Sequence, residues 1–196
     1  MFDQAKDNPT RRRVLGVTPL LLGAAGFVWF RRNVLTPEAL PGSETGEQVS
    51  IVKFSDQGQN LGLVSLKKVV RTDTDWFTRL TPQQYYVTRK HSTDTPFTGT
   101  YYQLHKQGMF RCICCENALF SSDAKYDSGT GWPAFSAPIA KENVRTVDAP
   151  GASLDAGIEV LCRECDAHLG HIFNDGPPPT LLRYCINESS LRFVPA

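Results

Sequence analysis

Cysteine spacing gives the most direct chemical signal in this sequence. Four of its six cysteines form two Cys-x-x-Cys pairs, Cys112/Cys115 and Cys162/Cys165, with 46 residues between the pairs. Each such turn places two thiolates on one side of a tight loop, and two turns complete a tetrahedral four-thiolate site with no open position. The spacing therefore predicts one structural Zn²⁺ per chain, bound by these four cysteines.

Other interpretations of the same cysteines remain open. An oxidising compartment would favour two or three disulfides, and one Cys-x-x-Cys pair could instead be redox-active. Cys114 could replace a neighbouring ligand, and His168, three residues after Cys165, could also bind the ion. One zinc per folded chain by elemental analysis, lost with Cys162→Ser, is the result expected for the structural site, and a folded protein without metal would contradict it.

The sixth cysteine, Cys185, has no Cys-x-x-Cys partner. In an extended segment, alternation places Arg183, Cys185 and Asn187 on one face and Tyr184 and Ile186 on the other, toward the core. A guanidinium beside a thiol favours the thiolate, which is the nucleophilic form. The pattern indicates a reactive thiol on an exposed face; the competing interpretation is a small buried apolar side chain.

The elements that must position these residues are expected to be mainly β. From Phe97 onward, short apolar runs are separated by Gly, Pro, Asn and Asp every eight to twelve residues, which is typical of antiparallel strands. The fold class predicted is α+β leaning heavily to β, with short helices near the N-terminal side of the domain. The individual elements expected are a strand over 63–70, a helix over 75–80, a second helix with Thr81 as N-cap and Pro82 at its first position, and a strand region over 183–194 split by a turn at 187–190.

The N-terminal segment differs from the rest of the chain. Residues 1–13 are polar and end in three arginines, and residues 14–30 carry no charge. Seventeen residues is the lower limit for a membrane-spanning helix, while a basic region before an apolar run is also the layout of an export signal, here resembling a twin-arginine signal. We expect a twin-arginine-like signal or membrane anchor over 1–32, a polar linker over 33–48, and the folded domain over 49–196. The excess of positive charge before the apolar run predicts that the domain is exported, either periplasmic or anchored outside the cytoplasm.

Composition excludes several classes of protein. The 196 residues are 41% hydrophobic and 21% charged, as in an ordinary globular domain and unlike a disordered chain or a polytopic membrane protein. The first 33 residues hold six Lys/Arg against two Asp/Glu, so the remainder has 15 against 18. Without a basic stripe, nucleic acid is not an expected partner. Two other classes of protein would share the Cys-x-x-Cys pairs. A zinc-ribbon binding module would use both pairs but would not need Cys185, and a thiol-disulfide oxidoreductase would use one pair and leave the other without a function.

Five motifs, in their order along the chain, resemble those of the B-type peptide-methionine (R)-S-oxide reductases. They are residues 110–115, 120–122, 125–135, 162–173 and 183–187. The resemblance spans about residues 62–195 and includes the segments 80–85 and 97–99. It implies a β-rich fold of two antiparallel sheets, a structural zinc on the paired Cys-x-x-Cys motifs, and thiol-dependent reduction of methionine-R-sulfoxide in proteins or peptides.

The resemblance also implies a role for each site residue. Cys185 is the nucleophile and becomes a sulfenic acid; His168 and His171 are the active-site histidines, suited to protonate the departing oxygen; and Asn187 binds the polar end of the substrate through water. The substrate-binding residues implied are Trp132, which packs on the substrate methyl group, and Arg183, which stabilises the thiolate. Phe173 is a further candidate for lining the pocket, its competing interpretation being an ordinary core aromatic. Without the family, Trp132 would be read as a core residue beside a turn, and the His pair as structural.

The sequence departs from the family at Thr130, where many members carry a resolving cysteine. The sulfenic acid on Cys185 then lacks its usual internal partner. Either an external thiol, such as a thioredoxin-like protein, attacks Cys185 directly, or Cys114 takes over. We expect the external reductant, because Cys114 stands between two predicted zinc ligands.

Overall fold

The computed structural model describes residues 46–147 and 152–196. The predicted signal or anchor over 1–32, and nearly all of the predicted linker over 33–48, lie outside the described residues. Within the described ranges, the helices are too short and too polar for any of them to cross a membrane.

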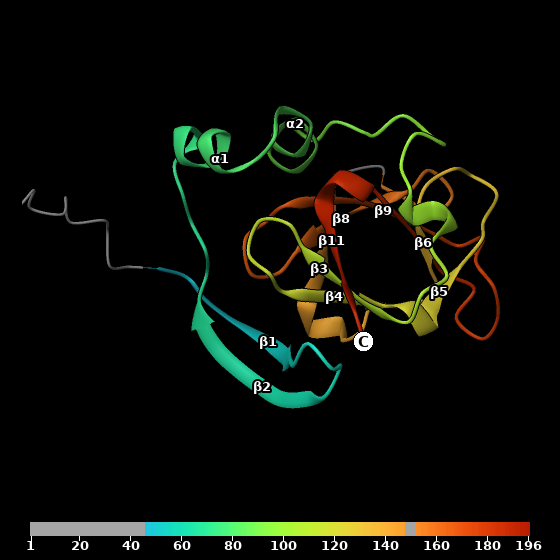
Figure 1. Ribbon diagram of the computed structural model, residues 1–196, viewed down its shortest axis with the longest axis horizontal. Helices are drawn as coiled ribbons and strands as arrows, with labels where there is room; N and C mark the ends of the chain where they lie inside the picture. The colour runs from blue at the N-terminus through green and yellow to red at the C-terminus, as the bar shows by residue number, and fades with distance from the viewer. Residues whose placement is uncertain (1–45, 148–151) are drawn as a thin grey trace, which may run out of the picture. The chain divides into compact units, whose positions relative to one another are not determined.

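Antiparallel strands dominate the described residues and form three sheets (Figure 1). The first is the hairpin of β1 (Gln48–Phe54) and β2 (Asn60–Lys67). The second has six strands in the order β5-β6-β10-β9-β8-β7: β5 Lys125–Tyr126, β6 Ala134–Phe135, β10 Arg183–Ile186, β9 His168–Phe173, β8 Ile158–Cys162 and β7 Val144–Thr146. The third has three strands in the order β11-β3-β4: β11 Leu191–Pro195, β3 Gly108–Cys112 and β4 Ala118–Ser121. The mainly β, antiparallel prediction is confirmed, and the split region over 183–194 is β10, a 3₁₀ turn and β11.

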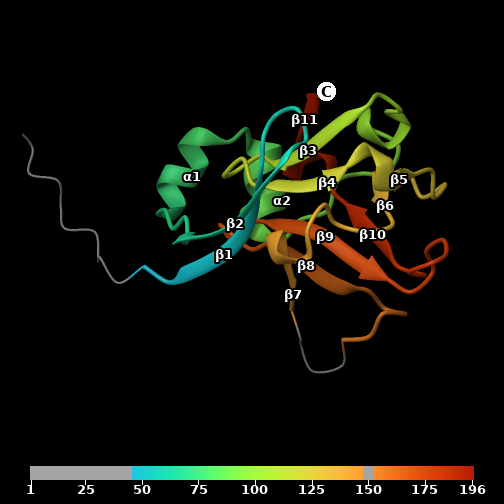
Figure 2. The same cartoon turned by 90° about the horizontal axis from the view of Figure 1, so that it is seen from below.

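Two short α-helices lie on one side of the strands, as Figures 1 and 2 show. Helix α1 (Asp73–Arg79) begins after Thr72, whose side chain accepts a hydrogen bond from the amide of Asp75. Helix α2 (Pro82–Lys90) has the predicted Thr81 cap and Pro82 start, with a complete capping box to Gln84. Single 3₁₀ turns add η1 (Tyr101–Gln103), η2 (Ser122–Ala124), η3 (Lys141–Asn143) and η4 (Glu188–Ser190).

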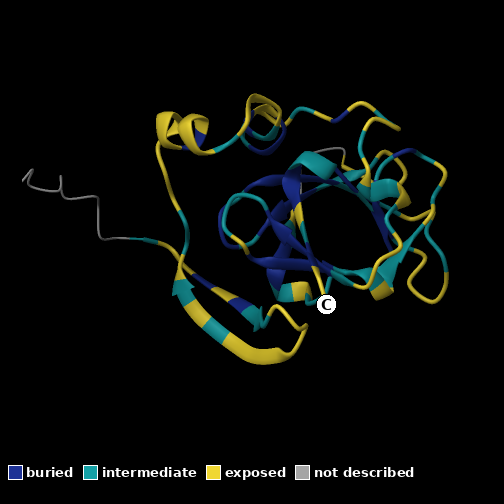
Figure 3. Cartoon of the chain, viewed as in Figure 1, coloured by how far each residue is buried: buried dark blue, intermediate teal, exposed yellow. Residues whose placement is uncertain are grey.

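The core lies between the two larger sheets. Phe135 of the six-stranded sheet stacks on Phe120 of the three-stranded sheet, with ring centroids 4.4 Å apart, and meets Phe110 edge-on at 5.0 Å. All three rings are fully buried. Burial in Figure 3 is concentrated on the facing strands of these sheets, whereas β2 is largely exposed.

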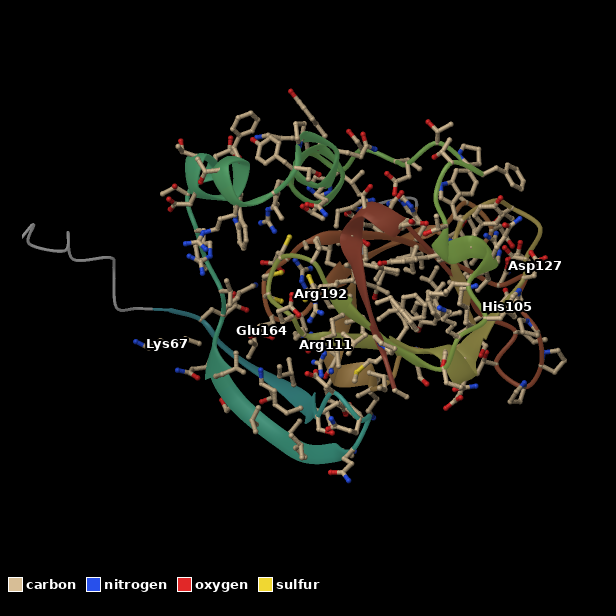
Figure 4. All side chains as sticks on the ribbon, in the orientation of Figure 1. Lys67, His105, Arg111, Asp127, Glu164 and Arg192 are labelled. Carbon is tan, nitrogen blue, oxygen red and sulfur yellow. The ribbon has the colours of Figure 1, made fainter. Side chains whose placement is uncertain are left out.

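The β1–β2 hairpin is fastened to the rest of the domain by buried polar side chains. The amide of Asn143 bonds both to the N–H and to the carbonyl of Val52, at 2.8 Å each. Arg111 donates from its guanidinium to the carbonyls of Phe54 and Ser55. Figure 4 labels Arg111 on the side of the sheets that faces this hairpin.

Candidate active site and metal centre

The four paired cysteines converge on one point. The Sγ atoms of Cys112, Cys115, Cys162 and Cys165 all lie within 4.8 Å of one another. Two separations, Cys112–Cys165 at 3.7 Å and Cys115–Cys162 at 3.6 Å, are close to the edge of about 3.8 Å that a tetrahedron with Zn–S bonds of about 2.3 Å requires. The cluster can therefore hold a tetrahedral metal ion, as the spacing predicted.

The two Cys-x-x-Cys turns have the same backbone design. In the β3–β4 turn the amide of Glu116 donates to the carbonyl of Cys112 at 2.9 Å, and in the β8–β9 turn the amide of Asp166 donates to that of Cys162 at 3.0 Å. Glu116 and Asp166 both adopt left-handed backbone angles, with φ of 65° and 53°. Since one turn belongs to each of the larger sheets, an ion held by both would join the sheets.

The geometry favours the four-cysteine group, and Cys114 lies outside it, although the Cys114 thiol is hydrogen-bonded to Cys112 and Cys165. All six cysteines lie in the described residues, and all six are free thiols without a disulfide. His168 is not in the four-cysteine group; its Nδ1 is hydrogen-bonded to Glu159 instead. Cys114 lies half-buried in the β3–β4 turn, outside the pocket that contains Cys185.

Cys185 opens into a small pocket of about 130 Å³ on the six-stranded sheet. It is paired across β10 and β9 with His171, and across β10 and β6 with Ala134. The pocket brings together five of the predicted site residues with two others, the full lining being Thr93, Trp132, Gly170, His171, Phe173, Cys185 and Asn187. Two predicted residues, His168 and Arg183, lie behind this lining.

The backbone of Asp94 holds two of the lining residues in place. Its carbonyl accepts from Trp132 Nε1 at 2.8 Å, and its amide donates to Asn187 Oδ1 at 2.9 Å. The Asp94 carboxylate is itself fixed by Gln83 and by the amide and hydroxyl of Ser189. Trp132 and Asn187 are thus held by the two consecutive peptide groups that flank Asp94, which suits a pocket that must hold a small group in one orientation.

A β-bulge brings the two histidines together. In a regular strand His168 and His171, three residues apart, would face opposite sides. The β8–β9 register instead shifts between Val160 and Leu161, so that Val160 pairs with Gly170 but Leu161 pairs with His168. The imidazole centroids consequently lie 5.4 Å apart. Gly170, at the shift, has φ of 151° and closely approaches the Cys185 carbonyl, which accounts for a glycine there.

The two histidines have different surroundings. His171 is half-buried and lines the pocket, whereas His168 is buried and lies behind it. Burial lowers the pKa of both imidazoles, and the Glu159 carboxylate partly opposes this. Burial alone would raise the pKa of Glu159, but hydrogen bonds from His91 and His168 outweigh it and hold that pKa below its ordinary value. Only His171 is therefore placed to meet a ligand in the pocket directly.

Arg183 stands on the same side of β10 as Cys185, but this face is not exposed as the alternation suggested. Arg183 and Asn187 are buried, because other elements of the domain cover them. The guanidinium makes two bonds to Asp175, at 2.8 and 2.9 Å, and its Cζ lies 4.2 Å from the centroid of the Phe173 ring. Burial raises the pKa of Cys185 above its ordinary value; the Arg183 charge and a hydrogen bond with Thr130 lower it without outweighing burial.

Thr130 replaces the expected resolving cysteine and lies against Cys185. Its hydroxyl is 2.7 Å from the Ser128 hydroxyl. The sequence analysis did not identify three acidic residues around the site: Asp94, Glu159 and Asp175. An Asp or Glu two or three residues from a site motif carries no signal of its own, since its role depends on register and on chain packing.

Comparison with known proteins places the chain in a family. Residues 80–195 match the SelR domain. The chain is 49% identical over 128 residues to "Peptide methionine sulfoxide reductase MsrB" of Herminiimonas arsenicoxydans, covering 65% of this chain and 92% of that protein. It is 46% identical over 140 residues to "Methionine-R-sulfoxide reductase B2, mitochondrial" of Danio rerio, covering 68% and 77%. The corresponding MsrB of Pseudomonas aeruginosa is 46% identical over 130 residues, covering 66% and 98%. The family match covers more than half of the chain, and the matching motifs assemble around Cys185. The chain therefore belongs to the SelR-domain family of MsrB methionine sulfoxide reductases.

Proposed function

We propose that this protein reduces methionine-R-sulfoxide in proteins or peptides to methionine, with Cys185 as the nucleophile. The observation that carries the proposal is the pairing of Cys185 with His171 across β10 and β9 in one pocket. A thiol and an imidazole that share a pocket of about 130 Å³ supply a nucleophile and an acid to the same small group. Trp132 offers an apolar wall for the substrate methyl group. Asn187 donates one N–H to the Leu169 carbonyl at 3.2 Å and has a second N–H to bind the polar end of the substrate through water.

In the first step the Cys185 thiolate attacks the sulfoxide sulfur. The attack forms an S–S bond while the oxygen takes up a proton from His171. The hydroxyl is then transferred to the Cys185 sulfur as the S–O and S–S bonds of that intermediate break, and methionine leaves. Cys185 is then a sulfenic acid, one step up the oxidation ladder. Because burial raises the pKa of Cys185, ionisation of the thiol is expected to depend on the nearby Arg183 charge.

In the second step an external dithiol returns Cys185 to its reduced form. One thiol of the reductant displaces water from the sulfenic acid and forms a mixed disulfide, which the second thiol then resolves. A thioredoxin-like protein fits this role, since Thr130 cannot form a disulfide and Cys114 lies in the metal-site turn. Oxidised proteins or peptides that carry methionine-R-sulfoxide would be the other partners.

The four-cysteine centre is proposed to hold one structural Zn²⁺. The thiolates of Cys112, Cys115, Cys162 and Cys165 fill all four positions of a tetrahedron, so the ion would stabilise the fold and leave no position for substrate. Sulfur-only ligands and near-tetrahedral separations support zinc over a hard cation such as Mg²⁺.

We also propose that residues 1–32 direct export, either as a twin-arginine-like signal or as a membrane anchor. The twin-arginine layout before an uncharged run of seventeen residues supports this. The catalytic domain would then act in the periplasm or at the outer side of the membrane. Fusion of residues 1–40 to a reporter tests it, and a reporter that stays in the cytoplasm would contradict it.

The decisive experiment separates the sulfoxide epimers. The protein, incubated with dithiothreitol and pure R or S methionine sulfoxide peptide, should convert only the R epimer, and Cys185→Ser should abolish turnover. Cys114→Ser is the matched control, because it removes a half-buried thiol outside the pocket and should keep activity. Turnover by Cys185→Ser would refute the assignment.

A further inference from the structure

A second group of ligand-type side chains, His91, Glu159 and His168, lies close together outside the lining of the pocket. Glu159 Oε1 is 2.5 Å from His91 Nδ1 and 2.6 Å from His168 Nδ1. A tetrahedral metal with bonds of about 2.0–2.1 Å would hold such atoms about 3.3 Å apart. These separations are therefore hydrogen bonds to one shared oxygen, unlike the sulfur separations in the four-cysteine group.

The shared oxygen fixes the orientation of a buried ring. With Nδ1 of His168 directed at Glu159, Nε2 points the other way, where it is buried and has no partner among the described residues. The His168 side chain is 2% exposed, and its ring packs against that of His171, which lines the pocket. Glu159 is itself paired with His171 across β8 and β9. One carboxylate thus stands beside both histidines of the site.

His91 provides the outer end of this arrangement. It caps helix α2 in a left-handed conformation with φ of 56°, and its side chain is 57% exposed. It shares the same oxygen with His168, and repulsion between the two imidazoles lowers the pKa of His168, opposite to the effect of Glu159. The titratable groups around Glu159 are therefore His91 from α2 and His168 and His171 from β9.

We infer that Glu159 is a positioning residue for the reductase reaction. Its carboxylate orients His168 and keeps His168 and His171 able to carry a proton beside Cys185. His91, at the surface, opposes this effect of Glu159. The inference rests on the proposed function, because the proton is the one that the sulfoxide oxygen takes up. It assigns no contact between Glu159 and substrate.

Two substitutions with opposite expected signs test it. Glu159→Gln removes the charge that raises the pKa of both histidines, so the titration midpoints of His168 and His171 should move to lower pH. The alkaline limb of the kcat profile should move the same way, with KM unchanged. On that limb kcat should fall several-fold, a small part of the roughly 100-fold or more that general acid catalysis contributes.

His91→Asn keeps the left-handed cap, which Asn tolerates, and removes the competing imidazole. The His168 midpoint should then move to higher pH, with kcat at low pH retained. NMR titration of the histidines in the zinc-loaded protein measures both shifts without reference to turnover. A merely structural role for Glu159 would lower the unfolding midpoint and leave the titrations in place. Midpoints that stay fixed, or move the same way in both variants, would overturn the inference; a wild-type protein inactive on R-sulfoxide would refute the proposed function alone.

Discussion

Substitution of Gly170 by alanine tests whether the β-bulge sets the geometry of the site. Gly170 has φ of 151°, and a Cβ built there would overlap the carbonyl oxygen of Cys185 and lie 3.0 Å from the Cα of Ile186. Both neighbours are backbone atoms of β10, so they can move only if β9 and β10 separate. A backbone angle that L residues rarely adopt costs about 1–3 kcal/mol, and forced overpacking costs about 1–3 kcal/mol more. The free energy of unfolding should therefore fall by about 2–6 kcal/mol, a large part of the stability of a domain.

Gly129→Ala is the matched control. Gly129 also has a positive φ, 70°, but a Cβ there would meet nothing within 4 Å. Only the cost of the left-handed backbone conformation applies there, so the free energy of unfolding should fall by about 1–2 kcal/mol. Urea unfolding of the zinc-loaded variants, followed by circular dichroism, gives both values at constant m. Equal unfolding midpoints for the two variants would refute the argument that the close approach of β9 to β10 requires glycine.

Three further predictions concern the metal and the reactive sulfur. Cys162→Ser, or a strong chelator, should remove the metal and unfold the domain. The binding free energy of a structural zinc, about 10–16 kcal/mol, is as large as the whole stability of a domain, about 5–15 kcal/mol. A thermal unfolding transition that is unchanged without metal would contradict this prediction. Arg183→Met should raise the pKa of Cys185 further, since the guanidinium lowers it, so the midpoint of iodoacetamide alkylation against pH should move upward, and a downward shift would reverse the assigned sign. Thr130→Cys should restore an internal disulfide with Cys185 after one turnover without reductant, which mass spectrometry detects as a loss of two hydrogens; a persistent sulfenic acid in that variant would show that position 130 does not reach Cys185.

Local signals in the sequence were sufficient for several elements. Thr81 followed by Pro82 identified the start of α2, and the structure adds a capping box with Gln84 to that predicted start. The two Cys-x-x-Cys pairs likewise identify four residues that converge, because each pair already lies on one short turn. Strand boundaries were less well predicted: the expected strand over 63–70 is β2, Asn60–Lys67.

The parts that could not be predicted depend on long-range packing. Alternation correctly put Arg183, Cys185 and Asn187 on one face, but it carries no information about what covers that face, and two of the three are buried. The bulge in β9 could not be predicted from the local sequence either, because it depends on how β8 pairs with β9. Glu159 receives its role only through that pairing, and through a helix cap 68 residues away.

The hydrogen bonds between the β1–β2 hairpin and the rest of the domain indicate where the independently folding unit begins. The family match starts at residue 80, after the hairpin. Yet Asn143, which is completely buried, directs its amide to Val52, and Arg111 directs its guanidinium to Phe54 and Ser55. Cutting the gene at the edge of the family match would remove two of the three side-chain hydrogen bonds of Asn143 and the bonds from Arg111 to the hairpin carbonyls, each worth about 0.5–3 kcal/mol net. Expression boundaries for this enzyme should accordingly be drawn ahead of Gln48.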